Sequence, residues 1–191
     1  MTDFVSFNPE WRPPVLETDR LVVRPYTEAD APHLFPLASN PNSTKYTLWE
    51  HHKSINDTLN FVRDYATARY SEGVPEPMAI SFKDDPERKP IGSCGCFWAS
   101  HPNRTMELGY WLAEPYWGRG IVVEACRALV GYVFTAIQPQ RIQARVIEGN
   151  PASVRVLDKL GFRFEGTLRS AILRRGNFED VHIFAMLTGE R

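Results

Sequence analysis

The sequence predicts a single mixed α+β domain, in which a twisted, mostly antiparallel sheet of about seven strands is flanked by about four helices. Three observations support this prediction. The chain has 191 residues, a length that suits one domain. Hydrophobic residues make up 43% of it, which is enough for a packed core. The predicted elements follow the order β-α-α-β-β-β-α-β-α-β-β within residues 16–191, after a lead-in at residues 1–15, with no linker or internal repeat.

The first predicted elements are a strand and two helices. Residues 20–26 form a run rich in β-branched side chains, which is typical of a strand. Thr27 is suited to an N-cap, so we expect a helix from there to about Ala38. Ser54 begins a longer amphipathic helix that ends near Ser71, because apolar side chains recur along one side of it.

Three short strands are predicted next. They are the apolar or aromatic segments Met78–Phe82, Ile91–Trp98 and Met106–Leu112. Turn-forming residues separate them, at 84–86 and at 101–103. Short strands joined by such turns favour an antiparallel meander.

Helices and strands alternate in the rest of the chain. A helix is expected from Ile121 to about Phe134, followed by a strand at Ile142–Ile147. Ala152–Leu160 forms the next helix, which Gly161 ends. The last two predicted strands are Phe162–Leu168 and Val181–Leu187.

Charge and hydropathy exclude several classes of function. Lys and Arg number 22 against 23 Asp and Glu, giving a net charge of −1, so we expect no direct binding to nucleic acid. The best candidate for a membrane span, Ala128–Ile137, is ten residues long. A helix needs about 20 apolar residues to cross a bilayer, so no membrane partner is expected.

The cysteine count and the N-terminal residues predict a cytoplasmic protein. Three cysteines, Cys94, Cys96 and Cys126, are too few and of the wrong parity for a disulfide framework. The N-terminal residues lack the apolar run of a secretory signal. Cys94 and Cys96 share one face of a predicted strand, where core packing is the expected role.

The most informative segment is the loop Gly118-Arg119-Gly120, which lies between a strand and a helix. Such a loop presents backbone N–H groups at a helix N-terminus, where the macrodipole also favours an anion such as a pyrophosphate. Glycines let phosphate oxygens approach the main chain, and Arg119 adds positive charge. The segment is neither a P-loop nor a dinucleotide-binding fingerprint, because it lacks both glycine patterns. Taken alone, it is also compatible with a simple turn.

Four motifs resemble those of the GCN5-related N-acetyltransferases (GNAT), and more closely their ribosomal-protein N-acetyltransferase (RimJ/RimL-like) branch. The resemblance extends from about Leu16 to Leu187. It implies the fold of the GNAT family, with acetyl-CoA as cofactor and CoA as product. The motifs are Glu-Thr-Asp-Arg-Leu-Val-Val-Arg (17–24), Glu-Leu-Gly-Tyr-Trp-Leu (107–112), Tyr-Trp-Gly-Arg-Gly-Ile-Val-Val-Glu-Ala (116–125) and Asn-Pro-Ala-Ser-Val-Arg-Val-Leu-Asp-Lys-Leu-Gly-Phe (150–162).

The resemblance also implies a set of cofactor-binding residues, drawn from the end of one strand, the glycine loop and the start of two helices. They are Tyr110, Trp111, Leu112, Trp117, Gly118, Arg119, Gly120, Ile121, Val122, Val123, Asn150 and Ser153. The loop departs from the family pattern at its last position, where Val122 replaces the usual Gly or Ala. Asn150 and Ser153 are equally suited to capping the helix that follows, with Pro151 at its first position.

Two residues are candidates for acid–base chemistry. In the RimJ/RimL-like pattern, a glutamate at the position of Glu107 accepts the proton of the amine, directly or through water. A strand glutamate that pairs with an arginine is the alternative interpretation. Many branches of the family carry a tyrosine where this chain has Leu157, so Ser153 is left as the candidate acid for the leaving thiolate. Cys126 is a poor nucleophile candidate, because it lies inside a predicted helix.

The acceptor site is expected to include Trp49, His51 and Asp180. Trp49 and the adjacent His51 and His52 fall between the two early helices, in the region that shapes the acceptor site of related enzymes. No metal is expected, because neighbouring histidines without further ligands at suitable spacing usually lie in a polar loop. Asp180 follows a predicted hairpin turn and is either a wall of the acceptor site or a turn residue.

The predicted function is acetyl transfer from acetyl-CoA to a primary amine, by direct transfer in a ternary complex. The resemblance favours a protein N-terminal α-amine as acceptor. An α-amine with a pKa of about 8 is roughly one-tenth neutral at pH 7, whereas a lysine amine is almost entirely charged. The alternatives are a small amine or amino-sugar acceptor, or a non-catalytic module that binds acyl-CoA. Either a monomer or a homodimer is compatible with the sequence.

Overall fold

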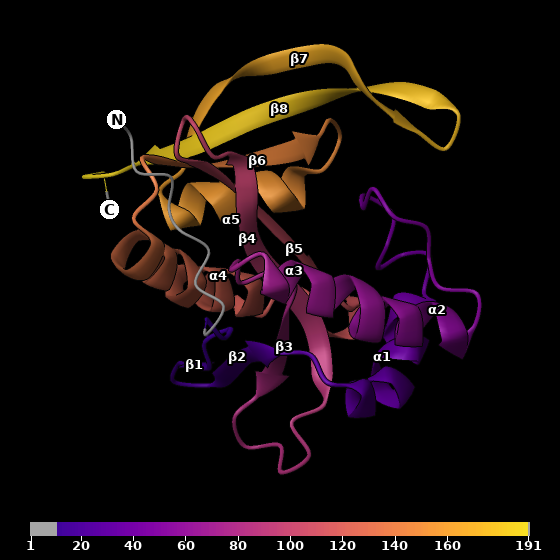
Figure 1. Ribbon diagram of the computed structural model, residues 1–191. Helices are drawn as coiled ribbons and strands as arrows, with labels where there is room; N and C mark the ends of the chain where they lie inside the picture. The colour runs from indigo at the N-terminus through magenta and orange to yellow at the C-terminus, as the bar shows by residue number, and fades with distance from the viewer. Residues whose placement is uncertain (1–10, 191) are drawn as a thin grey trace.

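The centre of the fold is a sheet of eight strands, drawn in the computed structural model of Figure 1, which describes residues 11–190. The strand order is β1-β2-β3-β4-β5-β6-β8-β7. Every neighbouring pair is antiparallel except β5 and β6, which are parallel. The strands are β1 (Leu16–Glu17), β2 (Leu21–Pro25), β3 (Met78–Phe82), β4 (Pro90–Ser100), β5 (Thr105–Leu112), β6 (Arg141–Ile147), β7 (Arg163–Arg174) and β8 (Asn177–Leu187).

Helices cover both faces of this sheet. The elements η1, α1, α2, η2 and α3 lie on one face, and α4 and α5 lie on the other (Figure 1). No helix within residues 11–190 combines the length and the apolar character needed to cross a membrane. The helical elements are η1 (Glu28–Asp30), α1 (Ala31–Ala38), α2 (Ile55–Asn60), η2 (Phe61–Ala66), α3 (Thr67–Ser71), η3 (Glu114–Tyr116), α4 (Ile121–Tyr132), η4 (Val133–Ile137) and α5 (Pro151–Leu160).

The predicted mixed α+β class and the order of its main elements are confirmed. The segments α2, η2 and α3 follow one another without a break, so they form the single long helix expected after Ser54. Ser54 caps it as predicted, since its Oγ accepts a hydrogen bond from the Asp57 N–H at 3.4 Å. The two-residue strand β1 was not predicted, and most of the predicted lead-in lies outside the described residues.

The final hairpin is longer than predicted, because β7 continues beyond Leu168 after a bulge. Residues 169–171 lie between the pairs Leu168↔Val181 and Ile172↔Glu179, so three residues of β7 face one of β8. Ser170 adopts a φ of 49° there, and its N–H donates to Asp180 Oδ1 at 2.7 Å. The bulge could not be predicted from the sequence, because polar residues in the middle of a strand hide the break in the alternation of buried and exposed positions.

The core has two parts, one on each face of the sheet. The larger part fills the space between the sheet and α4, where Leu129 packs among residues such as Met106 and Ile142. The smaller part lies under α1 and η2 and includes Leu34 and Val62. Burying each such side chain contributes about 1.5–3 kcal/mol, so the two faces together hold the helices on the sheet.

The sheet is split between β5 and β6. These strands pair only at Thr105↔Arg141, Met106↔Ile142 and Glu107↔Gln143. Beyond Glu107, β5 continues with β4 alone, from Leu108 to Leu112, while β6 stays paired with β8 along its whole length. Backbone groups of β5 that face the split therefore have no partner strand in the described part of the chain.

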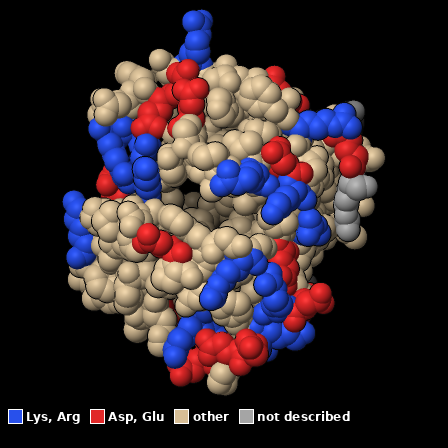
Figure 2. All heavy atoms as spheres, turned by 180° about the vertical axis from the view of Figure 1, so that it is seen from behind, with Lys and Arg blue, Asp and Glu red and all other residues tan. Residues whose placement is uncertain are grey.

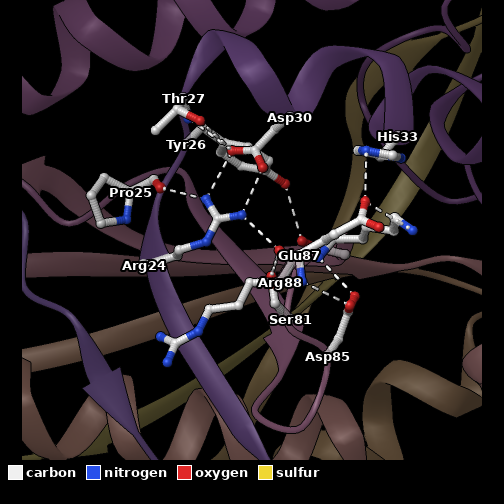
Figure 3. A network of polar contacts seen from close by, with 12 residues as sticks. Arg24, Pro25, Tyr26, Thr27, Asp30, His33, Ser81, Asp85, Glu87 and Arg88 are labelled. Atoms are coloured by element: carbon white, nitrogen blue, oxygen red, sulfur yellow. Dashed lines mark hydrogen bonds and ion pairs between the residues drawn. The ribbon is translucent and has the colours of Figure 1, made fainter.

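A buried ion pair joins the sheet to the first helices (Figure 3). Arg24 on β2 donates from both terminal nitrogens to Asp30, at 2.8 and 2.6 Å. The same guanidinium donates to the backbone carbonyls of Pro25 and Arg88, and Asp30 accepts from the Thr27 N–H at 2.8 Å. All these groups are satisfied by one another, so removing one partner leaves a buried charge alone.

We therefore predict that Asp30→Asn lowers the free energy of unfolding by about 3–5 kcal/mol, because it leaves the Arg24 charge without its partner. Urea denaturation followed by circular dichroism measures this change. The exposed pair Lys83 and Glu17 is the matched control, and Glu17→Gln should leave the denaturation midpoint almost unchanged. Equal effects of the two variants would contradict the assignment of Arg24–Asp30 as a structural tie.

Candidate active site

The glycine loop and the N-terminus of α4 form an anion site. Gly118 and Gly120 adopt φ values of 76° and 74°, a left-handed conformation that disfavours side chains. The first intrahelical bond of α4 runs from the Glu124 N–H to the Gly120 carbonyl at 3.1 Å. The N–H groups of Ile121, Val122 and Val123 precede it and have no acceptor within the helix, so they are free to bind an anion.

The side chains of the loop, including Val122 at its last position, leave this site open. Val122 packs against the apolar core, so its β-branched side chain is directed into the protein. Trp117 is half-exposed, and its indole N–H donates to the Leu112 carbonyl at 2.7 Å, which ties the loop to the end of β5. Arg119 is exposed at the rim of the loop. These placements fit a pyrophosphate at the start of α4.

Residues before β2 hold the loop and α4 together. Glu124 on α4 accepts hydrogen bonds from Thr18 Oγ1 at 2.6 Å and from Arg20 Nε at 2.7 Å. Arg20 also donates from Nη2 to the Arg119 carbonyl at 3.2 Å. Burial alone would raise the pKa of Glu124, but the hydrogen bonds from Thr18 and Arg20 lower it below its usual value. Glu124, in the first turn of α4, is therefore ionised, and the Arg20 guanidinium offsets its negative charge near the anion site.

The face opposite to that of Figure 1 is hollowed at its centre. Figure 2 shows Lys and Arg side chains beside this hollow, interspersed with Asp and Glu. A basic side chain at the mouth of such a hollow can contribute to binding an anionic ligand.

Glu107 lies where β5 and β6 part. Its side chain is about one-tenth exposed and bridges the two strands: Oε1 accepts from Arg145 Nε at 2.7 Å, and Oε2 accepts from Gln143 Nε2 at 3.0 Å. Glu107 shares a face of β5 with Gly109 and Trp111, because side chains alternate along a strand. The structure therefore places this predicted base at the apex of the split, in an ion pair with an arginine.

Tyr110 and Ser153 meet on the α5 side of the split. The Tyr110 hydroxyl lies 2.7 Å from Ser153 Oγ, and it also donates to the Ser153 carbonyl at 3.3 Å. Burial raises the pKa of Tyr110 well above its usual value, so the phenol stays protonated at any physiological pH. Asn150 caps α5, since its Oδ1 accepts from the Ser153 N–H at 3.2 Å. The resemblance implies Tyr110 and Ser153 as cofactor-binding residues, but the sequence gives no signal for this contact.

An aromatic cavity of about 360 Å³ lies on the other face of β5. We define the aromatic cavity by its rings and its floor. Its floor is formed by β4 and β5 at Gly95 and Gly109, and its walls come from α1, η2, the loop between α1 and α2, and the segment before β3. The rings around it are those of Trp49, His52, Phe61, Tyr65 and Trp111, while Tyr110 lines it although its hydroxyl contacts Ser153 on the α5 side.

His52 is part of this cavity, whereas the predicted His51 is not in its lining. The Nδ1 of His52 lies 2.7 Å from Thr58 Oγ1, and the centroids of the His52 and Trp49 rings are 5.4 Å apart. Burial lowers the pKa of His52 below its usual value, so the imidazole is neutral at pH 7. The pair of adjacent histidines was the signal in the sequence, but only the fold decides which of them faces inward.

The tip of the β7–β8 hairpin is tied to the loop that carries Trp49. Arg174 Nη1 donates to the Lys45 carbonyl at 2.7 Å, and Arg175 donates to the Thr44 carbonyl and to Glu50 Oε1, each at 3.1 Å. Figure 1 shows the hairpin reaching over this loop. Asp180, predicted for the acceptor site, binds the N–H of the bulge residue Ser170 instead of facing the cavity lining.

The chain belongs to the GNAT acetyltransferase family. Residues 20–163 match the family described as "Acetyltransferase (GNAT) domain". The "Uncharacterized N-acetyltransferase YoaA" of Bacillus subtilis (strain 168) is 33% identical over 174 residues, covering 91% of this chain and 97% of that protein. The "Ribosomal-protein-serine acetyltransferase" of Escherichia coli (strain K12) is 33% identical over 85 residues, 44% of this chain and 48% of that one.

A solved structure supports the same fold. The structure of RimL, a ribosomal L7/L12 α-N-protein acetyltransferase in complex with coenzyme A, superimposes with a TM-score of 0.80 at 20% identity, covering 91% of this chain and 98% of that one. The protein is thus an acetyl-CoA-dependent N-acetyltransferase. Its open glycine loop and the free N–H groups at the start of α4 fit the pyrophosphate of that cofactor.

We predict that Arg20→Met weakens acetyl-CoA binding by up to about fivefold, because an uncompensated Glu124 carboxylate then opposes the cofactor phosphates at the helix N-terminus. Isothermal titration calorimetry measures the dissociation constant. The double variant Arg20→Met/Glu124→Gln should recover most of the lost affinity, since it removes the uncompensated charge. A double variant as weak as Arg20→Met alone would contradict this electrostatic explanation.

Proposed function

We propose that this enzyme acetylates the α-amine of protein N-termini, by direct transfer from acetyl-CoA in a ternary complex. The observation that carries the proposal is the split between β5 and β6, which has the cofactor cradle on one face and the aromatic cavity on the other. Two substrates entering from opposite faces meet there without a covalent enzyme intermediate. The similarity to a ribosomal-protein-serine acetyltransferase and to RimL supports an N-terminal acceptor.

The cofactor is held by the loop and by α4, and its thioester supplies the acetyl group. The N–H groups of Ile121, Val122 and Val123 bind its phosphates. Backbone N–H groups in the segment Tyr110–Leu112 of β5, which borders the split, donate to the thioester carbonyl. Fixed donors of this kind stabilise the negative charge that develops on the carbonyl oxygen during transfer.

Glu107 accepts the proton that the amine loses. Its carboxylate is directed toward the apex of the split and is held there by Arg145 and Gln143. Because Glu107 is not in the lining of the aromatic cavity, the proton moves through a bridging water. An α-amine, of which about one-tenth is neutral at pH 7, needs only modest help of this kind.

Ser153 and Tyr110 stabilise the leaving thiolate together. The 2.7 Å contact between the Tyr110 hydroxyl and Ser153 Oγ allows either group to donate, and with Tyr110 as the donor the Ser153 proton is free to bind the sulfur. Because burial raises the pKa of Tyr110, this phenol acts as a hydrogen-bond donor that keeps its proton. Many family branches use a tyrosine at the position of Leu157 as the acid for the leaving thiolate. In this enzyme Ser153 on α5 takes that role, supported by Tyr110 on β5.

The proposal extends to the setting in which the enzyme acts. We propose that residues 16–191 work as one catalytic domain in the cytoplasm, as a monomer or a homodimer. The contacts of residues Thr18 and Arg20 with Glu124 support the single domain, because they join the two ends of the cofactor site.

For Glu107→Gln, we predict a fall in kcat of about 100-fold or more, because the variant removes the general base. Acetyl-CoA binding should persist, since Glu107 lies away from the loop. The assay follows the mass increase of about 42 Da on an N-terminal peptide. Glu165→Gln is the matched control, because Glu165 also pairs with an arginine on β6, Arg141, but lies outside the split. Unchanged turnover in Glu107→Gln would overturn the role given to Glu107.

A second variant tests the leaving-group contact. Ser153→Ala should lower kcat by up to about tenfold with little change in KM for the peptide, because one hydrogen bond in the transition state is lost. Tyr110→Phe should lower kcat as well and leave the alkaline limb of the pH–rate profile in place, since the raised pKa keeps Tyr110 protonated there. An alkaline limb that vanishes in Tyr110→Phe would show that the phenol itself titrates.

A further inference from the structure

The aromatic cavity has more room than a small acceptor side chain needs. At Gly109 on its floor, a Cβ atom would meet nothing within 4 Å among residues 11–190, so the space above this glycine is open. At Gly95, directly opposite on β4, a Cβ atom would collide with Glu76 Cγ at 2.4 Å. The cavity is therefore closed over β4 and open over β5, beside the split where the amine must react.

The rings around this opening present both faces and edges. Trp49 and Trp111 pack edge to face with centroids 5.6 Å apart, and Phe61 stacks on Tyr65 at 5.7 Å. A planar or bulky apolar group entering between them gains contacts of the kind that aromatic pairs prefer. A methyl or hydroxymethyl group leaves most of the cavity of about 360 Å³ empty.

The polar groups of the lining do not offer a free charge. Glu76, its one carboxylate, accepts from Arg69 Nε at 2.9 Å and from the Tyr65 hydroxyl at 3.1 Å. A cationic ligand would compete with Arg69 for the same oxygens, and an anionic ligand would face Glu76 directly. His52 is neutral at pH 7 because burial lowers its pKa. An ionised group would therefore lose its hydration without gaining a partner.

We propose that the aromatic cavity is a specificity subsite for an uncharged aromatic or bulky aliphatic group next to the reactive amine of the acceptor. This inference rests on the proposed acetylation of N-termini and defines which N-termini are preferred: those whose first residue is large and apolar. The buried contact discriminates by size, as in other apolar pockets, where one methylene group changes the rate by about 10- to 200-fold.

The test compares kcat/KM for peptides that differ only in their first residue, which is Phe, Leu, Ala, Asp or Lys. We expect Phe and Leu to exceed Ala by at least about tenfold, and Asp and Lys to rank below Ala. Gly109→Leu should reduce the rate for the Phe peptide far more than that for the Ala peptide, because it fills the open floor. Gly109→Ala, which needs no unusual backbone conformation, should give a smaller effect in the same direction and guards against misfolding.

The matched control is Thr105→Leu, which adds the same side chain on the same face of β5, four residues from Gly109 and outside the cavity. Its preference for Phe over Ala should equal that of the parent enzyme. Calorimetric titration with acetyl-CoA reports that each variant has kept its fold and its cofactor site. A parent enzyme that favours Ala, Asp or Lys, or a preference that survives both Gly109 variants, would overturn the proposal.

Two free amines distinguish a failure of this inference from a failure of the proposed function. 2-Phenylethylamine and ethylamine carry the same reactive group with and without a ring. Acetylation of 2-phenylethylamine but of no peptide would support the subsite and contradict N-terminal acetylation. Equal turnover of all five peptides would support N-terminal acetylation and contradict the subsite. Failure to acetylate any aromatic amine or peptide would overturn both.

Discussion

The parting of β5 from β6 after Glu107 is the constraint on which the site depends. A sheet that stayed paired would bury the backbone groups of residues 108–112 in hydrogen bonds and leave no passage between its faces. Because β6 remains paired with β8 and β5 with β4, each strand is stable without the other beyond this point. The side chain of Glu107 spans the apex and binds Arg145 and Gln143 on β6, which fixes where the opening begins.

Polar contacts of long sequence separation hold the two faces around this opening. In the segment 17–24, Thr18 and Arg20 bind Glu124 of α4 on the cofactor face, and Arg24 binds Asp30 before α1 on the acceptor face. One short stretch beside β2 therefore ties both helical layers to the sheet. This explains why a motif far from the glycine loop accompanies it in the resemblance to the family.

The sequence predicts the elements and the glycine loop before α4 well, because both depend on local signals. The periodicity of apolar residues indicates the strands, and Gly118 and Gly120 indicate the loop. The acceptor side depends on contacts between distant segments, which no local pattern contains. Thus the sequence could not choose His52 over His51 and gave no signal for the contact between the Tyr110 hydroxyl and Ser153. The apolar side of the helix predicted after Ser54 includes Phe61 and Tyr65, and the sequence did not show that these two also line a cavity.

The central claim is that cofactor and acceptor enter from opposite faces and meet at the split. Binding of a conjugate that joins CoA through an acetyl spacer to the α-amine of a peptide beginning with Phe tests it most directly, by calorimetric titration. Simultaneous occupation of both faces predicts binding at least about 100-fold tighter than that of CoA alone, because the second contact becomes intramolecular. A conjugate that binds no more tightly than CoA would contradict the account.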